Sequence, residues 1–256
     1  RGYSEVTFSR LAAQIGAREA IIHKEFHLSS ADPRQVGADK VQKLGHTNYD
    51  VADQLSNMGM EAIHPKAAKV LRQAQVPLRV TNAFDLGDPG TLIDDRPADR
   101  PAVEIVTGLD IFALELFEQD MVGVKGYDAA ILDVLMRHNV RIVSKTSNAN
   151  TITHYLDSSM KVMRRVEKDL AGLYPRAEVT ARPLAMAAAI GRDLGGLAVL
   201  TRGLQALEKG GMASLGASQG PRNVDVQFIL DRDDLQSAIR ALHDELIAHQ
   251  PARIRS

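Results

Sequence analysis

The 256-residue sequence contains no cysteine, which excludes a disulfide framework and a thiolate metal site. It has no apolar run that approaches the roughly 20 residues needed to span a bilayer, so no transmembrane helix is predicted. An excess of one charge is also absent, because 31 basic residues face 32 acidic ones and the formal net charge is −1. This balance argues against a general nucleic-acid or membrane-surface binder, which carries a basic excess. With 45% hydrophobic residues, the chain can instead bury a sizeable core.

The first part of the chain alternates between helix and strand signals, which predicts an α/β sheet domain. Asn48 or Asp50 can cap one helix, and Pro65 is favourable at the start of another. A polar stretch at residues 23–37 is predicted to be a loop, and the charged, proline-containing residues 94–101 are predicted to be a linker. We expect helices at residues 8–15, up to residue 58 and at 66–75, and strands at 20–22 and 77–80.

The second part contains an internal repeat of an alternating strand followed by an amphipathic helix. The strands are predicted at residues 151–157 and 224–231, and the helices at 158–170 and 232–247. Each strand follows a predicted loop, at residues 144–150 or 217–223, and each loop follows a helix with apolar residues at helical spacing. The expected faces of these helices are Tyr127, Ile131, Leu135 and His138, then Leu197, Leu200, Leu204 and Leu207, and in the last helix Leu235, Ile239, Leu242 and Leu246. A repeated β-α-β-β-α unit is the ferredoxin-like pattern.

Three motifs follow one another between Met58 and Ile93. They read Gly-Met-Glu-Ala-Ile-His-Pro-Lys-Ala, then Pro-Leu-Arg-Val-Thr-Asn-Ala-Phe, then Pro-Gly-Thr-Leu-Ile. In this order they closely resemble the end of the catalytic domain of aspartokinases. The opening Arg-Gly-Tyr-Ser-Glu-Val-Thr resembles the signature Gly-Arg-Gly-Gly-Ser-Asp-x-Thr of the same family. The resemblance implies an α/β fold in which part of an amino-acid-kinase domain is followed by two ferredoxin-like ACT domains.

The resemblance also implies the domain limits. Residues 1–95 are expected to be the carboxyl-terminal part of the kinase domain, and residues 102–256 the tandem ACT domains. The first ACT unit is expected at about 108–172 and the second at about 175–250. Because the family usually inserts the first ACT unit within the second, the strand at residues 103–107 is expected in the second unit's sheet.

The activity implied by the resemblance is aspartate kinase. Such an enzyme transfers the γ-phosphoryl group of ATP to the side-chain carboxylate of L-aspartate with Mg²⁺, at the start of lysine, threonine, methionine and ectoine synthesis. Tyr3, Glu5 and the sequence His-Lys-Glu-Phe-His-Leu-Ser-Ser from His23 onward look like the branch associated with ectoine synthesis. The family further implies a cytoplasmic homodimer joined through ACT edges, with no nucleic-acid or membrane partner.

The candidate aspartate site lies at the beginning of the chain. By resemblance, Arg1 and Ser4 hold the substrate, and an arginine and a hydroxyl beside helix-start amides do form a good carboxylate cradle. Glu5 takes the catalytic acidic position, which orients the substrate and the basic groups near the transferred phosphoryl. Tyr3 replaces a glycine and Glu5 an aspartate, so the geometry must differ slightly from that of the family. The alternative is an ordinary surface helix.

The candidate nucleotide loop ends in Ala-Asp-Pro-Arg, as it does in the family. Resemblance assigns Ser29, Asp32, Arg34 and Glu61 to nucleotide binding, although Glu61 replaces a lysine that neutralises phosphate charge. His23 and His27 are four residues apart and could form a metal pair. With no cysteine and no third ligand nearby in the sequence, no protein metal site is expected.

The two predicted loops of the repeat are the candidate effector sites. Resemblance to the family assigns a lysine or threonine effector to Ser144, Thr146, Ser147 and Asn148 in one loop, and to Ser218, Gln219, Gly220 and Asn223 in the other. Asn148 replaces a glutamate, and an amide binds an ammonium group more weakly than a carboxylate does, so weak or altered lysine feedback is expected. The alternative is that both loops are solvated strand connections.

One family motif has no counterpart here. Aspartokinases begin with Lys-Phe/Tyr-Gly-Gly-Ser/Thr-Ser, whose lysine and glycine-rich turn stabilise the transferred phosphoryl. The expectation is that this chain is the carboxyl-terminal part of such an enzyme and is inactive alone. The alternative is a non-catalytic ACT chain that binds amino-acid effectors and pairs with a catalytic chain; an in-frame upstream motif would distinguish the two.

Overall fold

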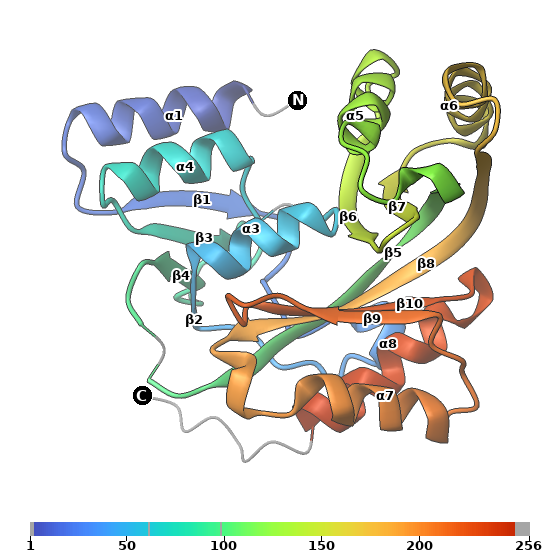
Figure 1. Ribbon diagram of the computed structural model, residues 1–256. Helices are drawn as coiled ribbons and strands as arrows, with labels where there is room; N and C mark the ends of the chain where they lie inside the picture. Colours follow the sequence, from blue (N-terminus) through green and yellow to red (C-terminus); the bar gives the residue numbers. More distant parts are fainter. Residues whose placement is uncertain (1–2, 61, 98, 249–256) are drawn as a thin grey trace. The chain divides into compact units, whose positions relative to one another are not determined.

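The computed structural model describes residues 3–60, 62–97 and 99–248, which form two compact units (Figure 1). Unit 1 combines the described residues up to Gly108 with Ala187–Ile229 and with the segment from Gln236 onward. Unit 2 consists of Leu109–Met186 and Leu230–Leu235, so it interrupts unit 1 in the sequence. The expected domain limits remain predictions, because unit 1 contains segments from both of the expected domains.

An α/β arrangement forms the first part of unit 1. Its elements are α1 (Tyr3–Gln14), β1 (Ala20–Lys24), α2 (Pro33–Val36), β2 (His46–Asn48), α3 (Tyr49–Asn57), α4 (Pro65–Gln73), β3 (Leu78–Asn82) and β4 (Thr91–Asp94). The sheet has the order β1-β3-β4-β2, in which β1 pairs in parallel with β3 and β2 with β4, while β3 and β4 are antiparallel. Helices α1 and α4 lie side by side along one face (Figure 1).

Two helix starts lie where the sequence predicts them. The side chain of Asn48 accepts a hydrogen bond from Val51 N and caps α3. Pro65 is the first residue of α4, where its missing N–H has no cost because the first amides of a helix lack intrahelical partners. His64 precedes it, and its backbone N–H donates to the carboxylate of Glu5. The start of α4 is thereby fixed next to Glu5.

The segment predicted as a loop at residues 23–37 contains more regular secondary structure than expected. Strand β1 continues to Lys24 because its pairing with β3 extends to the pair Lys24↔Asn82. Asp32 then caps α2 by accepting a hydrogen bond from Arg34 N. The Asp-Pro pair therefore starts a short helix, since proline is well suited to the first helical position.

A second sheet contains the remaining strands in the order β6-β7-β5-β8-β10-β9. The strands are β5 (Ala102–Phe117), β6 (Arg141–Ser147), β7 (Thr151–Asp157), β8 (Glu178–Arg192), β9 (Gly216–Gln219) and β10 (Asp225–Leu230). The helices are α5 (Tyr127–Arg137), α6 (Met160–Leu173), α7 (Val199–Lys209) and α8 (Leu235–His243), with 3₁₀ turns η1 (Gln119–Met121), η2 (Leu194–Gly196) and η3 (Arg232–Asp234) and a π-helical turn η4 (Asp244–Ala248).

The predicted repeat is confirmed. Strand β5 leads into α5, β6, β7 and α6, and strand β8 leads into α7, β9, β10 and α8. Both β5, with 16 residues, and β8, with 15, contribute residues to each unit. The beginning of β5 belongs to unit 1 together with β9 and β10, as expected for the strand at residues 103–107. The fold class is thus an α/β part followed by ferredoxin-like units.

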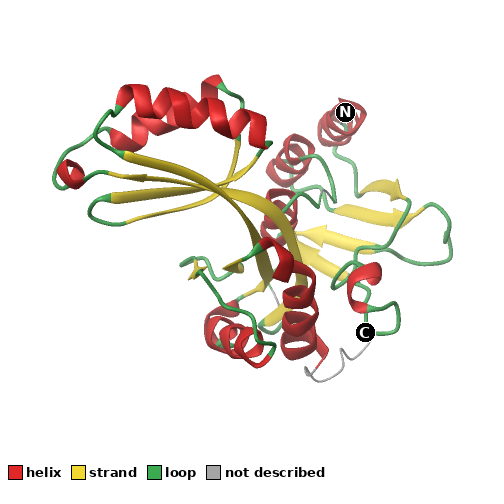
Figure 2. Cartoon of the chain, turned by 90° about the vertical axis from the view of Figure 1, so that its right-hand side faces the viewer, coloured by secondary structure: helices red, strands yellow, loops and turns green. Residues whose placement is uncertain are grey.

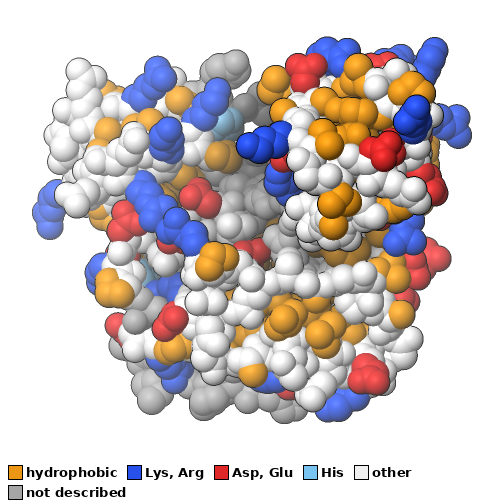
Figure 3. Space-filling model, viewed as in Figure 1, with side chains coloured by type: hydrophobic (Ala, Val, Ile, Leu, Met, Phe, Trp, Pro, Cys, Tyr) orange, Lys and Arg blue, Asp and Glu red, His pale blue; other side chains and the backbone are white. Residues whose placement is uncertain are grey.

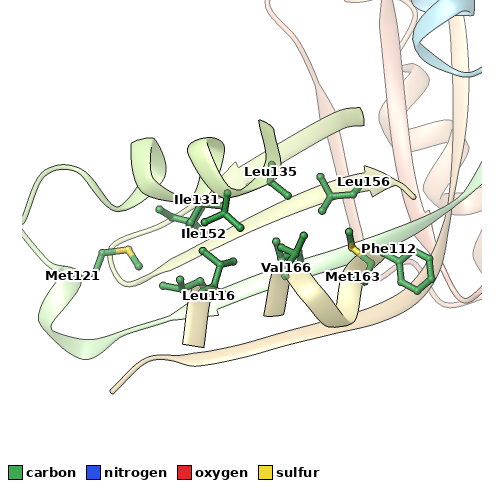
Figure 4. Packing of buried hydrophobic residues seen from close by; sticks show 12 residues of the cluster. Phe112, Leu116, Met121, Ile131, Leu135, Ile152, Leu156, Met163 and Val166 are labelled. Carbon is green, nitrogen blue, oxygen red and sulfur yellow. The ribbon is translucent and has the colours of Figure 1, made fainter. Parts of the chain in front are cut away.

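Unit 2 is built around one hydrophobic core. Helices α5 and α6 cover one face of its strands (Figure 2). Side chains from these helices and from β5 and β7 point toward one another in Figure 4, among them Phe112, Leu116, Ile131, Leu135, Ile152, Leu156, Met163 and Val166. The rings of Tyr127 and Tyr174 stack at its margin, with centroids 4.7 Å apart. The apolar face predicted for α5 is therefore confirmed.

Of the leucine face predicted for the helix at residues 197–207, only Leu207 is fully buried, while Leu197 and Leu200 are half-buried. In α7 the buried residues are Val199, Gly203, Ala206 and Leu207. Leu204 remains 37% exposed. Gly203 lies against the ring of Phe228 on β10, where a Cβ atom would clash. The buried face of α7 is therefore determined by how closely the helix packs on the sheet, and not by the spacing of its leucines. In the last helix, Ile239, Leu242 and Leu246 are buried as predicted.

After Asp94 the segment predicted as a linker lacks regular secondary structure where it is described, but unit 1 continues through it to Gly108. Asp94 is the last residue of β4, and residues 95–97 and 99–101 form neither helix nor strand. Basic and acidic side chains are interspersed over the face drawn in Figure 3, in keeping with the net charge of −1. Within the described part of the chain, no helix has both the length and the apolar character needed to cross a membrane.

Candidate active site

A cavity of about 670 Å³ lies where β1 and β3 end in unit 1. The segment after β1 lines it, together with Asn82, the last residue of β3 and the pairing partner of Lys24. Ligands of α/β proteins bind at the carboxyl ends of parallel strands, which is the position of this cavity. Most of the wall is apolar, formed by Phe26, Leu28, Val41, Leu55, Met60 and Ile105. A mainly apolar pocket with a few polar groups is typical of a small-molecule or cofactor site.

The predicted nucleotide residues that the structure describes all line this cavity. Ser29 donates its hydroxyl hydrogen bond to Ala31 O at 2.9 Å, which holds the loop in shape. Asp32 caps α2, and the side chain of Arg34 is 93% exposed, so its guanidinium is available to an incoming phosphate. Glu61 lies outside the described residues. The three described members therefore form one continuous wall.

Polar and charged side chains from three loop segments meet at the edge of the cavity. His27 lines the cavity, with Nε2 3.4 Å from Asp85 Oδ2 and Nδ1 3.7 Å from Asp88 Oδ1. Lys43, another lining residue, forms an ion pair with Asp88. His23 does not join His27, since its Nδ1 lies 2.7 Å from Thr81 Oγ1. The two candidate ligands that join His27, Asp85 and Asp88, thus come from the loop after β3, because β1 and β3 are parallel neighbours.

Glu5 connects the starts of two helices to the end of β1. Its Oε1 accepts a hydrogen bond from Lys24 Nζ at 2.8 Å, and its Oε2 accepts one from His64 N at 2.7 Å. Burial raises the pKa of Glu5, but these two hydrogen bonds outweigh burial and lower the pKa below its usual value. The carboxylate is therefore ionised and held in one orientation, next to the segment that lines the cavity.

The two residues predicted to bind aspartate are placed only in part. Arg1 lies outside the described residues. Ser4 is exposed in the first turn of α1, immediately before Glu5. The first amides of a helix lack intrahelical partners and carry the positive end of the helix dipole, so this end of α1 favours a carboxylate ligand.

A buried charged network lies next to the cavity wall. Glu104 precedes the lining residue Ile105 and is fully buried, and both Nε and Nη2 of Arg192 lie 2.6 Å from its Oε1. Thr47 donates to the other carboxylate oxygen at 2.5 Å. Arg192 Nη1 also donates a hydrogen bond to Nδ1 of His46. A neutral His46 therefore carries its ring proton on Nε2, and this N–H donates to the carboxylate of Asp94. The network joins β2 and β4 to β5 and β8.

Comparison with known proteins agrees with this geometry. The model of the "Amino acid kinase family" matches residues 1–82. "Aspartate kinase Ask_Ect" of Stutzerimonas stutzeri (strain A1501) is 51% identical over 249 residues, which is 96% of this chain and 52% of the relative. Chloroplastic aspartokinase 3 of Arabidopsis thaliana is 24% identical over 95% of this chain and 45% of its own length. Over nearly its whole length the chain is therefore similar to aspartate kinases, and its first 82 residues match the amino acid kinase family.

Solved aspartate kinases share the fold. The structure of E. coli aspartokinase III in complex with lysine and aspartate aligns with a TM-score of 0.80 at 22% identity, over 96% of this chain and 56% of that one. Aspartate kinase from Clostridium acetobutylicum aligns with a TM-score of 0.84 at 19% identity, over 96% and 58%. The chain thus spans about half the length of the aspartate kinases that it matches.

In unit 2, the first candidate effector segment is mostly strand rather than loop. Ser144, Thr146 and Ser147 belong to β6, paired with Tyr155, Thr153 and Ile152 of β7. Their polar side chains resemble a loop in sequence because β6 is at the end of the sheet order and largely exposed. Asn148 starts the turn, and its side-chain oxygen accepts hydrogen bonds from Asn150 N and Thr151 N.

The second candidate effector segment shows the same difference. Ser218 and Gln219 belong to β9, while Gly220 and Asn223 lie in the following turn. Gln219 Nε2 donates to Asn223 Oδ1 at 3.0 Å. The strand pairs with β10, which places Ser218 opposite Gln227. Both predicted loops are therefore shorter than the sequence indicates, since edge strands with polar side chains look like loops.

Sequence reasoning missed a charged cluster in unit 2. Lys145 Nζ lies 2.5 Å from Asp128 Oδ2, and His154 Nε2 lies 3.3 Å from Asp128 Oδ1. His154 is fully buried, and this burial lowers its pKa, although Asp128 acts in the opposite direction. The signal in the sequence was a histidine at an inward position of an alternating strand, between Ile152 and Leu156.

Proposed function

We propose that this chain is the carboxyl-terminal part of an aspartate kinase that transfers the γ-phosphoryl group of ATP to the side-chain carboxylate of L-aspartate. The product is 4-phospho-L-aspartate, the first intermediate toward lysine, threonine, methionine or ectoine. The observation that carries the proposal is the 51% identity to Ask_Ect over 96% of this chain. That identity also favours the ectoine-associated branch.

The cavity supports nucleotide binding at the predicted place. Its apolar wall suits the adenine ring, while Arg34 and Lys43 provide positive charge for the phosphates. Phosphoryl transfer depends mainly on positioning and on neutralising developing charge, so a base pocket bordered by cations is the arrangement that it requires. The structure of E. coli aspartokinase III with aspartate and ADP shares this fold, with a TM-score of 0.79 at 20% identity.

Mg²⁺ is proposed to enter with the nucleotide. Magnesium is usually held by one or two carboxylates together with substrate phosphates and water. Asp85 and Asp88 are the carboxylates at the edge of the cavity that fit this donor set. When bound, the ion would neutralise phosphate charge, and Lys43 would remain beside Asp88.

Glu5 is proposed to act by positioning. Both its oxygens are engaged, so it orients Lys24 and the start of α4 rather than abstracting a proton. Ser4 and Arg1 are proposed to bind the carboxylate of aspartate at the start of α1. Among the described residues, Lys24 is then the cation that Glu5 holds and can direct toward the reacting groups.

An amino-acid effector and a second copy of the chain are the proposed partners. The turn at Asn148 and the turn at Gly220–Asn223 in the second repeat are the proposed effector segments. Strands β6 and β9 end the sheet order, so their outer edges offer backbone groups that a second copy can pair with. A location in the cytoplasm is proposed from the family's role in biosynthesis.

The test is an aspartyl hydroxamate assay with ATP, L-aspartate and hydroxylamine, run on this chain and on the full-length protein that contains it. Hydroxamate from the full-length protein alone supports a catalytic site completed by other residues. If neither protein forms hydroxamate while amino acids still raise the melting temperature, the chain is a regulatory module and the kinase proposal is wrong.

A further inference from the structure

The wall of the candidate nucleotide cavity is a pair of short extended segments. Ser29 and Lys43 form a β-bridge, Leu44 N donates to Leu28 O, and the segments at residues 28–30 and 42–44 run antiparallel. Side chains on both sides of this pair, including Leu28, Ser29, Val41 and Lys43, line the cavity. Any shift of the pair therefore moves several lining residues together.

Ser30 is the buried centre of this pair. Its backbone N–H donates to Gln42 O, and its carbonyl accepts from Val106 N on β5. Its hydroxyl oxygen accepts a hydrogen bond from Gln42 N at 2.9 Å. Ser30 is only 1% exposed, while its neighbours Ser29 and Ala31 line the cavity, so Ser30 holds the wall from the side away from the ligand.

The remaining partner of Ser30 comes from the last helix of the chain. The hydroxyl of Ser30 lies 2.9 Å from Nε2 of His243, the final residue of α8, and both residues are buried. Because the oxygen already accepts from Gln42 N, its proton is best placed toward His243, whose Nε2 then accepts. This contact spans 213 positions of the sequence within unit 1.

Two further contacts hold α8 against the same loop. Lys40 Nζ lies 3.0 Å from Asp244 Oδ1, and Arg240 Nε donates to Gln35 O at 2.9 Å. Directly after α8 the chain forms the π-helical turn η4, a geometry that is frequent at functional sites. Glu245 in that turn accepts hydrogen bonds from Arg202 of α7 through its side chain and its carbonyl. Helix α8 is thus tied to α7 at one side and to the cavity wall at the other.

We propose that His243 is a positioning residue for the nucleotide: through Ser30 it fixes the cavity wall, so the second repeat of the chain sets the affinity for ATP. The inference rests on the proposed nucleotide site, but it does not depend on which phosphoryl acceptor the protein uses. A displacement of α8 would loosen the wall before it affected the aspartate site at Glu5, which α8 does not contact by any hydrogen bond or ion pair among the described residues.

The experiment compares variants of the full-length protein by steady-state kinetics and by titration with a fluorescent ATP analogue. His243→Leu removes the acceptor and retains bulk, and we expect it to raise KM for ATP and the analogue's Kd about three- to tenfold, the worth of one buried hydrogen bond. KM for aspartate and kcat should stay within about twofold. Ser30→Ala should weaken ATP binding at least as much, because it also removes the hydrogen bond from Gln42 N. The double variant should match Ser30→Ala, because the contact between Ser30 and His243 is then already lost. His243→Gln, which restores an acceptor, should recover most of the affinity.

His154→Leu is the matched control, since it removes another fully buried histidine, in unit 2, and should leave the affinity for ATP unchanged. The inference is overturned if His243→Leu lowers only the melting temperature, if both substrates' KM values rise together, or if the effects of Ser30→Ala and His243→Leu add. If His243→Leu fails to fold, the same measurements on Ser30→Ala decide the question. A wild-type protein that binds the analogue without making hydroxamate contradicts the kinase proposal alone, whereas one that binds no nucleotide contradicts both.

Discussion

Lys24 Nζ lies 2.8 Å from Glu5 Oε1, so the last residue of β1 is bound to the first turn of α1. The other oxygen of the same carboxylate accepts a hydrogen bond from the start of α4. One side chain therefore joins three segments that converge at the carboxyl end of the parallel strands. Substitution at Glu5 should consequently affect positioning in the site more than the stability of the fold.

Glu5→Gln in the full-length protein keeps the shape of the side chain and removes its charge. We expect kcat for hydroxamate formation to fall about tenfold to a hundredfold, the range seen when a preorganised electrostatic contact is lost. Glu19→Gln is the control, because Glu19 pairs with Arg79 at 2.6 Å and has a similar exposure, 29% against 24% for Glu5. Equal losses of activity in the two variants would show that Glu5 has no special role.

Arg192→Met should destabilise unit 1 strongly. It leaves the fully buried carboxylate of Glu104 without its cation, and removing one partner of a buried ion pair costs about 3–5 kcal/mol in the free energy of unfolding. Adding Glu104→Leu should restore much of that loss, since both charges are then gone. Denaturant unfolding measures the effect. Arg141→Met, which breaks an exposed pair with Asp157, should cost less than about 1 kcal/mol; equal costs at the two sites would refute the argument.

Unit 2 should lose stability in mild acid because of His154. Burial lowers the pKa of His154 in the folded protein below its ordinary value of 6.5, so the unfolded chain takes up the proton first. The free energy of unfolding is therefore highest above pH 6.5, where His154 is neutral in both states. It declines as the pH falls from 6.5 toward the lower pKa of His154 in the folded protein. Asp128 and Lys145 face the ring and should modulate the slope. Urea unfolding between pH 7.5 and 5, followed by a probe in unit 2, should show a slope that His154→Leu removes; an unchanged slope would assign it to other groups.

Lysine should bind this protein weakly. Asn148 provides an amide where the family resemblance leads us to expect a carboxylate, and its oxygen already accepts hydrogen bonds from Asn150 N and Thr151 N. Calorimetric titration with lysine should give no tight binding, and tight binding to the wild type would contradict the prediction. Asn148→Asp keeps the turn and adds a charge, so lysine should bind more strongly. Asn150→Asp adds the same charge nearby and should not reproduce the gain.

Helix caps, proline and apolar spacing predicted those helices whose boundaries and faces are determined by residues within the helix or next to it. Asn48 and Pro65 start helices because a cap and a proline act within a few residues, and the apolar face of α5 follows from its spacing alone. The buried face of α7 could not be predicted in this way. It depends on the fit of Gly203 against Phe228, which is a contact between a helix and a strand further along the chain.

The candidate site was predictable to the extent that its residues are close in sequence. Ser29, Asp32 and Arg34 share one loop and line one cavity. The ligand group of His27 with Asp85 and Asp88 required the parallel pairing of β1 with β3, and the contact of Ser30 with His243 required the docking of α8. Neither pairing has a local signature, so short-range patterns could not reveal them.

The long strand β5 also limits how this chain can vary. Its residues alternate between faces, and Phe112, Leu114 and Leu116 all enter the core of unit 2. Insertion of a single residue near Gly108 would leave Val103 and Ile105 in place and turn all three of those side chains to the opposite face. Lengthening by two residues would keep the faces but shift every pair with β7. We therefore expect natural variation in chain length to accumulate in the turns, and β5 to keep a constant number of residues across relatives.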